Sequence, residues 1–179
     1  MVYRFRARHE LIERHRRAVR AAPLLLHLCI DRGFEPNGRI VAVDISETAL
    51  NKLRDRAGCE TLGNVEVVVG AVDDPHLPAG QFDAVMIHNA YHEMTEHAAM
   101  LAHFRAALKP GGRLVVVEPM HDSSRGLTRE KQVALHDIAI EIVDGELRAA
   151  GFGVLERDDA FIKFTAVPGG FWMIMARRP

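Results

Sequence analysis

The chain has 179 residues, of which 48% are hydrophobic and 26% are charged, and its formal net charge is -1. This composition is typical of one soluble globular domain, and the near-neutral charge gives no indication of nucleic-acid binding. The two cysteines do not form a disulfide framework and no apolar run approaches the roughly 18 residues of a membrane span, so we expect a cytoplasmic protein without a membrane segment.

The first 38 residues differ in composition from the rest. Seven arginines lie between Arg4 and Arg20, no lysine occurs in the segment, and no glycine precedes Gly33. We therefore divide the chain into an atypical basic N-terminal segment, residues 1–38, and a domain that comprises residues 39–179.

A short β-branched run, Ile40–Val43, predicts a buried parallel strand that ends at Asp44. Ser46 is a suitable N-cap for the helix that follows. Its apolar residues recur at helical spacing: Ala49, Leu50, Leu53 and Ala57. A carboxylate at the end of such a strand binds the ribose hydroxyls of a nucleotide in doubly wound folds, although Asp44 is equally suited to capping the helix.

Three further strands are predicted, at Val65–Val69, Phe82–Ile87 and Leu114–Val117. A helix begins near Thr95, and the sequence Lys109-Pro110-Gly111-Gly112 ends it, because proline cannot continue a helix. Two helices are predicted at residues 129–141 and 142–150.

Two last strands, Val154–Arg157 and Phe171–Ala176, are predicted to form an antiparallel hairpin. The alternation of strands and helices before them favours a mostly parallel sheet with helices on both faces. The fold class predicted is therefore α/β, Rossmann-like and doubly wound, with a C-terminal antiparallel hairpin.

Three segments, in this order and spacing, resemble class I S-adenosylmethionine-dependent methyltransferases. They are Val41-Ala42-Val43-Asp44-Ile45-Ser46, Leu77-Pro78-Ala79-Gly80-Gln81-Phe82-Asp83-Ala84-Val85, and Ala107-Leu108-Lys109-Pro110-Gly111-Gly112-Arg113-Leu114. A fourth, Asn89-Ala90-Tyr91-His92-Glu93-Met94, is similar to a subgroup described as predicted methyltransferases. The resemblance implies S-adenosyl-L-methionine as the cofactor.

The resemblance also implies a role for individual residues. Asp44 would bind the ribose hydroxyls and Ile45 would pack on one face of the adenine. Ala71, Val72 and Asp73 would face the adenine edge, and Ala71 stands where the family often has an acidic residue, so that Asp73 or Asp74 would replace it. His88 and Asn89 would lie beside the methionine part of the cofactor and the transferred methyl group.

One part of the family pattern is missing. A first strand and a glycine-rich loop, which holds the cofactor through backbone amides, precede the ribose-binding acid by roughly 17 to 20 residues in the family. At that distance this chain has Val19-Arg20-Ala21-Ala22-Pro23-Leu24-Leu25, without a glycine. Either the gene is truncated or frameshifted, which we favour, or the protein is a divergent member whose cofactor binding is altered or lost.

The chain contains ten histidines, and several lie close together between His88 and His97. A helical zinc motif needs His-Glu-x-x-His, whereas here His92-Glu93 is followed by a histidine one residue late, so we expect no metal site. His92, Glu118 and His136 are the candidates for a catalytic role near the acceptor, as acid, base or hydrogen-bond partner, and His121 is a further candidate.

The sequence therefore predicts a methyltransferase, possibly truncated, that transfers a methyl group to a small-molecule acceptor, with no nucleic-acid or membrane partner. The alternative is a non-enzymatic relic or binding module that keeps the fold but no longer binds the cofactor. The identity of the acceptor and the oligomeric state are not determined by the sequence.

Overall fold

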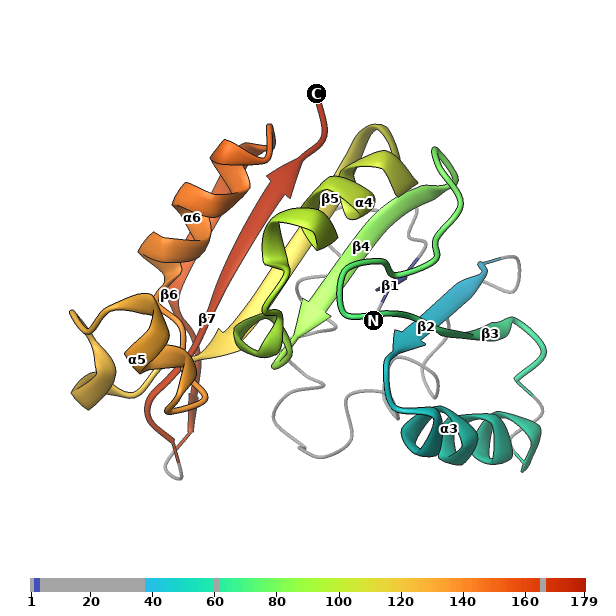
Figure 1. Cartoon of the computed structure of the whole chain (residues 1–179), viewed down its shortest axis with the longest axis horizontal. Helices are drawn as coiled ribbons and strands as arrows, with labels where there is room; N and C mark the ends of the chain where they lie inside the picture. The colour runs from blue at the N-terminus through green and yellow to red at the C-terminus, as the bar shows by residue number, and fades with distance from the viewer. Residues whose placement is uncertain (1, 4–37, 60–61, 165–166) are drawn as a thin grey trace.

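The computed structural model describes residues 2–3, 38–59, 62–164 and 167–179 (Figure 1). The basic segment before residue 38 lies almost entirely outside these residues, so the domain boundary near residue 38 stays a prediction. Among the described residues, no helix is long and apolar enough to cross a membrane.

The first part of the fold is a strand, a helix and a second strand. Strands β2 (Ile40–Asp44) and β3 (Val65–Val69) pair in parallel, and helix α3 (Glu47–Cys59) connects them. Ser46 begins this helix as predicted, since its Oγ accepts a hydrogen bond from the backbone N–H of Ala49. The predicted apolar stripe faces inward at Leu50, Leu53 and Ala57.

The second part repeats this arrangement. Strands β4 (Phe82–His88) and β5 (Leu108–Pro119) pair in parallel, and helix α4 (His97–Ala107) connects them. The predicted face of α4 is buried, with Met100 at 7% and Leu101 at 1% exposure. The helix begins two residues after the predicted cap Thr95, and no side chain caps it.

The C-terminal hairpin is confirmed. Strands β6 (Gly153–Phe164) and β7 (Val167–Arg177) pair antiparallel, and β7 also pairs antiparallel with β5. The order in this sheet is therefore β4-β5-β7-β6. Helix α6 (Ile140–Ala149) packs on β6 and β7. The core lies in this part of the molecule, and Trp172 is its largest buried side chain.

A two-residue strand lies where the sequence suggested a missing first strand. Strand β1 (Val2–Tyr3) pairs antiparallel with β2 and also contacts β4 (Figure 1). The β3-β2-β1 sheet therefore meets the larger sheet at β4. The family's first strand is parallel and ends in a glycine loop, and no such strand or loop occurs in the described part of the chain.

The predicted helix at residues 129–141 is wrong. Helix α5 (Arg129–Val133) is only five residues long, and residues 134–139 form a turn and an extended segment before α6. The physical reason is Gln132, whose buried side chain bonds three backbone groups. Its Nε2 donates to the carbonyl oxygens of Ser124 and Leu127, and its Oε1 accepts from the N–H of Ala139. These bonds fold the chain back after one helical turn.

Candidate functional site

The predicted cofactor residues all follow strands of the sheet. Asp44 ends β2, Ala71 to Asp73 follow β3, and His88 ends β4. Figure 1 shows that β2 and β4 run in the same direction, and β3 is parallel to β2. The predicted residues therefore lie along one edge of the sheet, the carboxyl edge, where ligands bind in α/β folds of this kind.

Asp44 is exposed, and its carboxylate has a local partner. Its Oδ1 accepts a hydrogen bond of 2.7 Å from the backbone N–H of Ser46, and its carbonyl oxygen accepts from Gly70. The side chain thus accepts a hydrogen bond from a backbone N–H at the start of helix α3, as the helix-cap interpretation expects. This bond holds the carboxylate against the backbone just before helix α3.

Two large apolar side chains that follow these strands are exposed. Ile45 is 62% and Val72 is 57% exposed to solvent. They come from the ends of two neighbouring parallel strands, β2 and β3. An apolar pair in this place suits a flat, apolar ligand surface such as a base.

The acidic residues after β3 differ in their partners. Asp74 accepts a 2.7 Å bond from the N–H of His76 and forms a 3.7 Å ion pair with His103, and its carbonyl oxygen accepts from Ala71. Asp73 is exposed. Asp73 is therefore the better candidate to replace the acid that the family has at the position of Ala71.

His88 and Asn89 mark the end of β4. The His88 ring stacks on Phe171 of β7, with the ring planes 3° apart and the centroids separated by 5.8 Å. Burial lowers the pKa of His88 to about 4, so its imidazole is neutral at pH 7. Asn89 is exposed and has a φ of 48°, a left-handed conformation that turns the chain sharply after the strand.

A buried carboxylate holds the segment that follows. Oε1 of Glu118, near the end of β5, accepts 2.7 Å bonds from the N–H groups of Ala90 and Tyr91, and Oε2 lies 2.6 Å from Nδ1 of His92. Tyr91, His92 and Glu93 form the 3-10 helix η1 (Tyr91–Glu93). Glu118 is fully buried, so it positions His92 and cannot itself contact an acceptor.

Burial and Glu118 have opposite effects on His92. Burial lowers the pKa of this histidine, but the hydrogen bond and the negative charge of Glu118 outweigh burial and raise it above the ordinary value. Because Nδ1 faces the carboxylate, it carries the proton of the neutral ring, and Nε2 is the nitrogen with a free lone pair. The nearest acid to Nε2 is Glu93, whose Oε1 is 3.7 Å away.

A second network joins η1 to the helices after β5. The Tyr91 hydroxyl donates a 2.7 Å bond to Oε2 of Glu146 on α6, and Arg129 of α5 donates 2.7 Å to Oε1 of the same carboxylate. Burial and this bond to Glu146 raise the pKa of Tyr91 far above its ordinary value. His97 also lies 3.3 Å from Glu146. His97 therefore belongs to this structural network.

A second histidine–carboxylate pair lies in the loop after β5. Nδ1 of His121 is 2.8 Å from Oδ1 of the buried Asp137, and the Ser124 hydroxyl, in the 3-10 helix η2 (Asp122–Ser124), donates to Oδ2 of that carboxylate. Asp137 is 1% exposed, whereas the side chain of His121 is 41% exposed. The pair ties the loop after β5 to the turn after α5.

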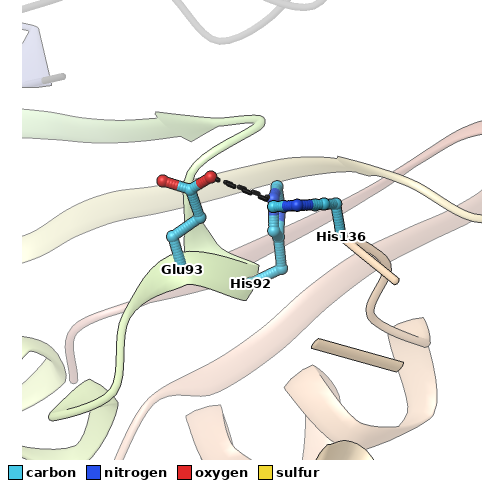
Figure 2. Close-up of side chains that lie close together, drawn as sticks. All are labelled: His92, Glu93 and His136. Carbon is cyan, nitrogen blue, oxygen red and sulfur yellow. Dashed lines mark ion pairs between the residues drawn. The ribbon is translucent and has the colours of Figure 1, made fainter. Parts of the chain in front are cut away.

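Three side chains of metal-binding types, those of His92, Glu93 and His136, converge in one place. Figure 2 shows the rings of His92 and His136 next to the carboxylate of Glu93. One ligand atom from each of the three lies within 4.8 Å of the others. His136 comes from the turn that follows α5 and has a φ of 57°. The spacing of His92 and His97 in the sequence predicts no metal site here, and that expectation stays a prediction.

The structure thus brings together His92, Glu118 and His136, the predicted catalytic candidates. Sequence reasoning missed the roles of Tyr91, Glu146 and Asp137. Tyr91 bonds Glu146, which is 55 positions away, and Asp137 bonds His121, which is 16 positions away. No spacing pattern in the sequence reveals such pairs.

Comparison with known proteins points to one family. A sequence model of that family, described as "Methyltransferase domain", matches residues 24–112. The match includes the first two of the three segments that carried the resemblance and the third as far as Gly112, and it begins within the basic N-terminal segment.

Relatives and solved structures agree with this match. The chain is 32% identical over 94 residues to the ubiquinone/menaquinone biosynthesis C-methyltransferase UbiE of Methylobacterium nodulans. This match covers 52% of this chain and 37% of that protein. The chain is also 32% identical over 85 residues to nocamycin O-methyltransferase of Saccharothrix syringae, and that match covers 48% of this chain and 30% of that protein. A crystal structure of a SAM-dependent methyltransferase from Aquifex aeolicus is similar with a TM-score of 0.68 at 20% identity, over 87% of this chain and 76% of that chain. The matches thus span only 37% and 30% of the length of these two curated relatives.

Proposed function

We propose that this chain, which belongs to the class I S-adenosylmethionine-dependent methyltransferase family, transfers a methyl group to a small-molecule acceptor. The cofactor site lies at the ends of β2, β3 and β4, and the acceptor site lies beside it, over η1 and the turn after α5. Neither site is made by one segment. Each combines residues from elements that are distant in the sequence, as binding sites in this architecture do.

One observation carries the proposal. The residues that the family resemblance assigns to the cofactor stand at the same edge of the sheet, in the order expected from β3 through β2 to β4. A chain that shared only short motifs with the family would have no reason to place Asp44, Val72 and His88 along one edge.

The side chains at this edge fit the cofactor chemically. Asp44 supplies a carboxylate for the ribose hydroxyls. The exposed apolar side chains of Ile45 and Val72 would be covered by the adenine. Covering them would remove apolar surface from water, which favours binding at about 25 cal/mol per Å².

S-adenosylmethionine supplies, when bound, a methyl group on a positively charged sulfonium sulfur. His88 and Asn89 would lie near that sulfur, at the end of β4. Because burial keeps the pKa of His88 at about 4, its ring carries no positive charge at neutral pH and does not repel the sulfonium. A protonated histidine there would oppose cofactor binding.

The acceptor side would be formed by His92 and His136, which face each other with ring centroids 5.7 Å apart. Glu118 acts through His92, since it is buried and its two oxygens are occupied by two backbone N–H groups and the imidazole. The enzyme needs only to orient the acceptor and exclude water, because methyl transfer is an in-line displacement.

Calorimetric titration with S-adenosylhomocysteine tests the proposal. We expect binding in the micromolar range, weakened about tenfold or more in Asp44→Ala, since a charged hydrogen-bond acceptor contributes about 1.5–3 kcal/mol. Asp55→Ala is the matched control, because Asp55 is an exposed acid on helix α3, away from the strand ends. Its affinity should equal that of the unmodified chain.

A relic without cofactor binding is the second candidate function. The two-residue antiparallel strand β1, in the place of a parallel first strand, favours it. If the folded chain binds no S-adenosylhomocysteine at millimolar concentration, the relic interpretation replaces the enzyme. Equal binding by the Asp44→Ala variant would instead show that the ligand binds elsewhere.

A further inference from the structure

We propose that His92, Glu93 and His136 form a binding site for a divalent transition-metal ion, with Zn²⁺ as the best fit. This inference goes beyond methyl transfer, because the three side chains need no cofactor to bind an ion. It also departs from the expectation that the sequence supports, which considered only ligands from the segment between His88 and His97.

The geometry brings three donor atoms to one point. Oε1 of Glu93 is 3.7 Å from Nε2 of His92 and 3.7 Å from Nδ1 of His136, and all three ligand atoms lie within 4.8 Å of one another. Figure 2 shows the carboxylate and both rings pointing into the same small volume.

The distances suit a tetrahedral ion after a small contraction. Bonds of about 2.0–2.1 Å to a tetrahedral ion place neighbouring ligand atoms about 3.4 Å apart. The ligand atoms would have to approach one another by about 0.3 Å for the 3.7 Å pairs and by at most about 1.4 Å for a pair at the 4.8 Å limit. The side chains of Glu93 and His136 are 66% and 76% exposed, so their rotation can supply this movement. His92 supplies the fixed point, since its side chain is only 4% exposed.

The environment of His92 is an independent observation that points to an ion. Glu118 accepts at Nδ1, which fixes the tautomer that leaves the lone pair on Nε2, and Nε2 faces the cluster. Among the residues that the structure describes, Oε1 of Glu93 lies 3.7 Å from Nε2, which is beyond hydrogen-bond distance. Metal-binding histidines characteristically donate their second ring nitrogen to a carboxylate in this way.

The donor set indicates the class of ion. Two imidazole nitrogens and one carboxylate oxygen are typical ligands of Zn²⁺ in catalytic sites, and they are poor ligands for Mg²⁺ or Ca²⁺, which prefer oxygen atoms only. Three protein ligands leave the fourth position open to water or to an oxygen of a ligand. If the proposed function holds, the open position would take the hydroxyl oxygen of the acceptor, and a hydroxyl-bearing acceptor is the substrate class that follows.

Titration of the full chain with Zn²⁺, in reducing buffer without cofactor, tests the site. We expect one ion per chain with micromolar affinity, and Co²⁺ should give the visible absorption bands of a tetrahedral site. His136→Ala and Glu93→Gln each remove one ligand and should weaken Zn²⁺ binding at least tenfold. Both replace exposed side chains, so the fold should persist, which thermal melting checks.

Two more variants separate this site from binding elsewhere. Glu118→Gln should weaken Zn²⁺ binding about 10- to 100-fold, because an amide that donates to Nδ1 of His92 moves the proton to Nε2. His103→Ala removes a half-exposed histidine on α4, away from the cluster, and should leave the affinity unchanged. Equal affinity in all four variants, or no binding by the unmodified chain at millimolar Zn²⁺, would overturn the proposal. Because no cofactor is present, either result is independent of the S-adenosylhomocysteine titration.

Discussion

The part of the molecule around β2 and β3 differs sharply from the part around β4, β5 and β7. The first has a small apolar cluster in which Ala42 and Leu53 are buried. The second contains the main core, to which β2 contributes Val41. Strand β1, only two residues long, lies at the junction of the two parts.

The two parts also differ in how they hold their functional side chains. On the β2–β3 side, the carboxylates of Asp44 and Asp74 accept hydrogen bonds from backbone N–H groups two positions further along the chain. On the other side, Glu118 and Glu146 bond residues that lie 17 to 55 positions away. The hydrogen bonds of these two aspartates therefore depend on local sequence, whereas those of the two glutamates depend on the complete fold.

The largest expected loss of stability follows a substitution in the main core. Trp172→Ala should lower the free energy of unfolding by about 3–5 kcal/mol, because it removes a fully buried ring and the 2.8 Å bond from its Nε1 to the Ile138 carbonyl. Leu53→Ala, in the small cluster, should cost about 2 kcal/mol. Urea denaturation measures both. If both substitutions lower the free energy of unfolding by the same amount, the two parts are equally well packed.

Removing the carboxylate of Glu118 should have the next largest effect. Glu118→Ala leaves the N–H groups of Ala90 and Tyr91 and the ring of His92 without their buried acceptor, at a cost of about 3 kcal/mol. Glu118→Gln keeps an oxygen for the two N–H groups, and it should cost about 1 kcal/mol. Urea denaturation of the two variants gives the difference.

The comparison between these two variants is the informative one. If Gln destabilises as much as Ala, the charge of Glu118 contributes more than its two backbone bonds. If neither variant is destabilised, η1 is held by Tyr91 and Glu146 instead, and the hydroxyl of Tyr91 becomes the group to remove by a Tyr91→Phe substitution.

His88 should make stability depend on pH. Its pKa is about 4 in the folded chain and 6.5 as the ordinary value, so the unfolded chain takes up a proton first as the pH falls. Stability is complete above about pH 6.5 and should decrease by about 3 kcal/mol by pH 4. The His88→Asn variant lacks this group, and the difference between the two pH profiles isolates it. If the stability of the two proteins changes with pH in the same way, the imidazole of His88 is not buried and neutral in the folded chain.

Much of the fold was predictable because it follows from local patterns. The β-branched run at Ile40–Val43, the cap at Ser46 and the stop at Pro110 each act within a few residues, and the strand β2, the helix α3 and the end of helix α4 that they predict are present. The helix predicted at 129–141 failed because Gln132 bonds three backbone groups five to eight positions away, and these bonds override helical propensity. Strand β1 was not predictable, since a two-residue antiparallel pairing has no sequence signal.

The sequence predicted which residues belong to the candidate site but not how they contact one another. His92, Glu118 and His136 were singled out because their residue types stand near strand ends, but the pairing of His92 with Glu118 follows from the parallel pairing of β4 and β5. The approach of His136 to Glu93 depends on the turn after α5, where the sequence predicted helix. Motif spacing finds residues on one element and misses clusters that two loops create.

The smallest expected change in stability is at the cofactor edge, and it makes the sharpest test of the contrast between the two parts. Ile45→Ala and Val72→Ala replace side chains that are 62% and 57% exposed, so each should change the free energy of unfolding by less than about 0.5 kcal/mol. Each should nevertheless weaken S-adenosylhomocysteine binding several-fold, because the adenine would cover the apolar surface that they present. Leu155→Ala, at 41% exposure on β6, is the matched control and should leave the affinity unchanged. Unchanged affinity in all three variants would mean that these exposed apolar side chains do not contact the adenine, and the cofactor site would have to be sought away from the ends of β2 and β3.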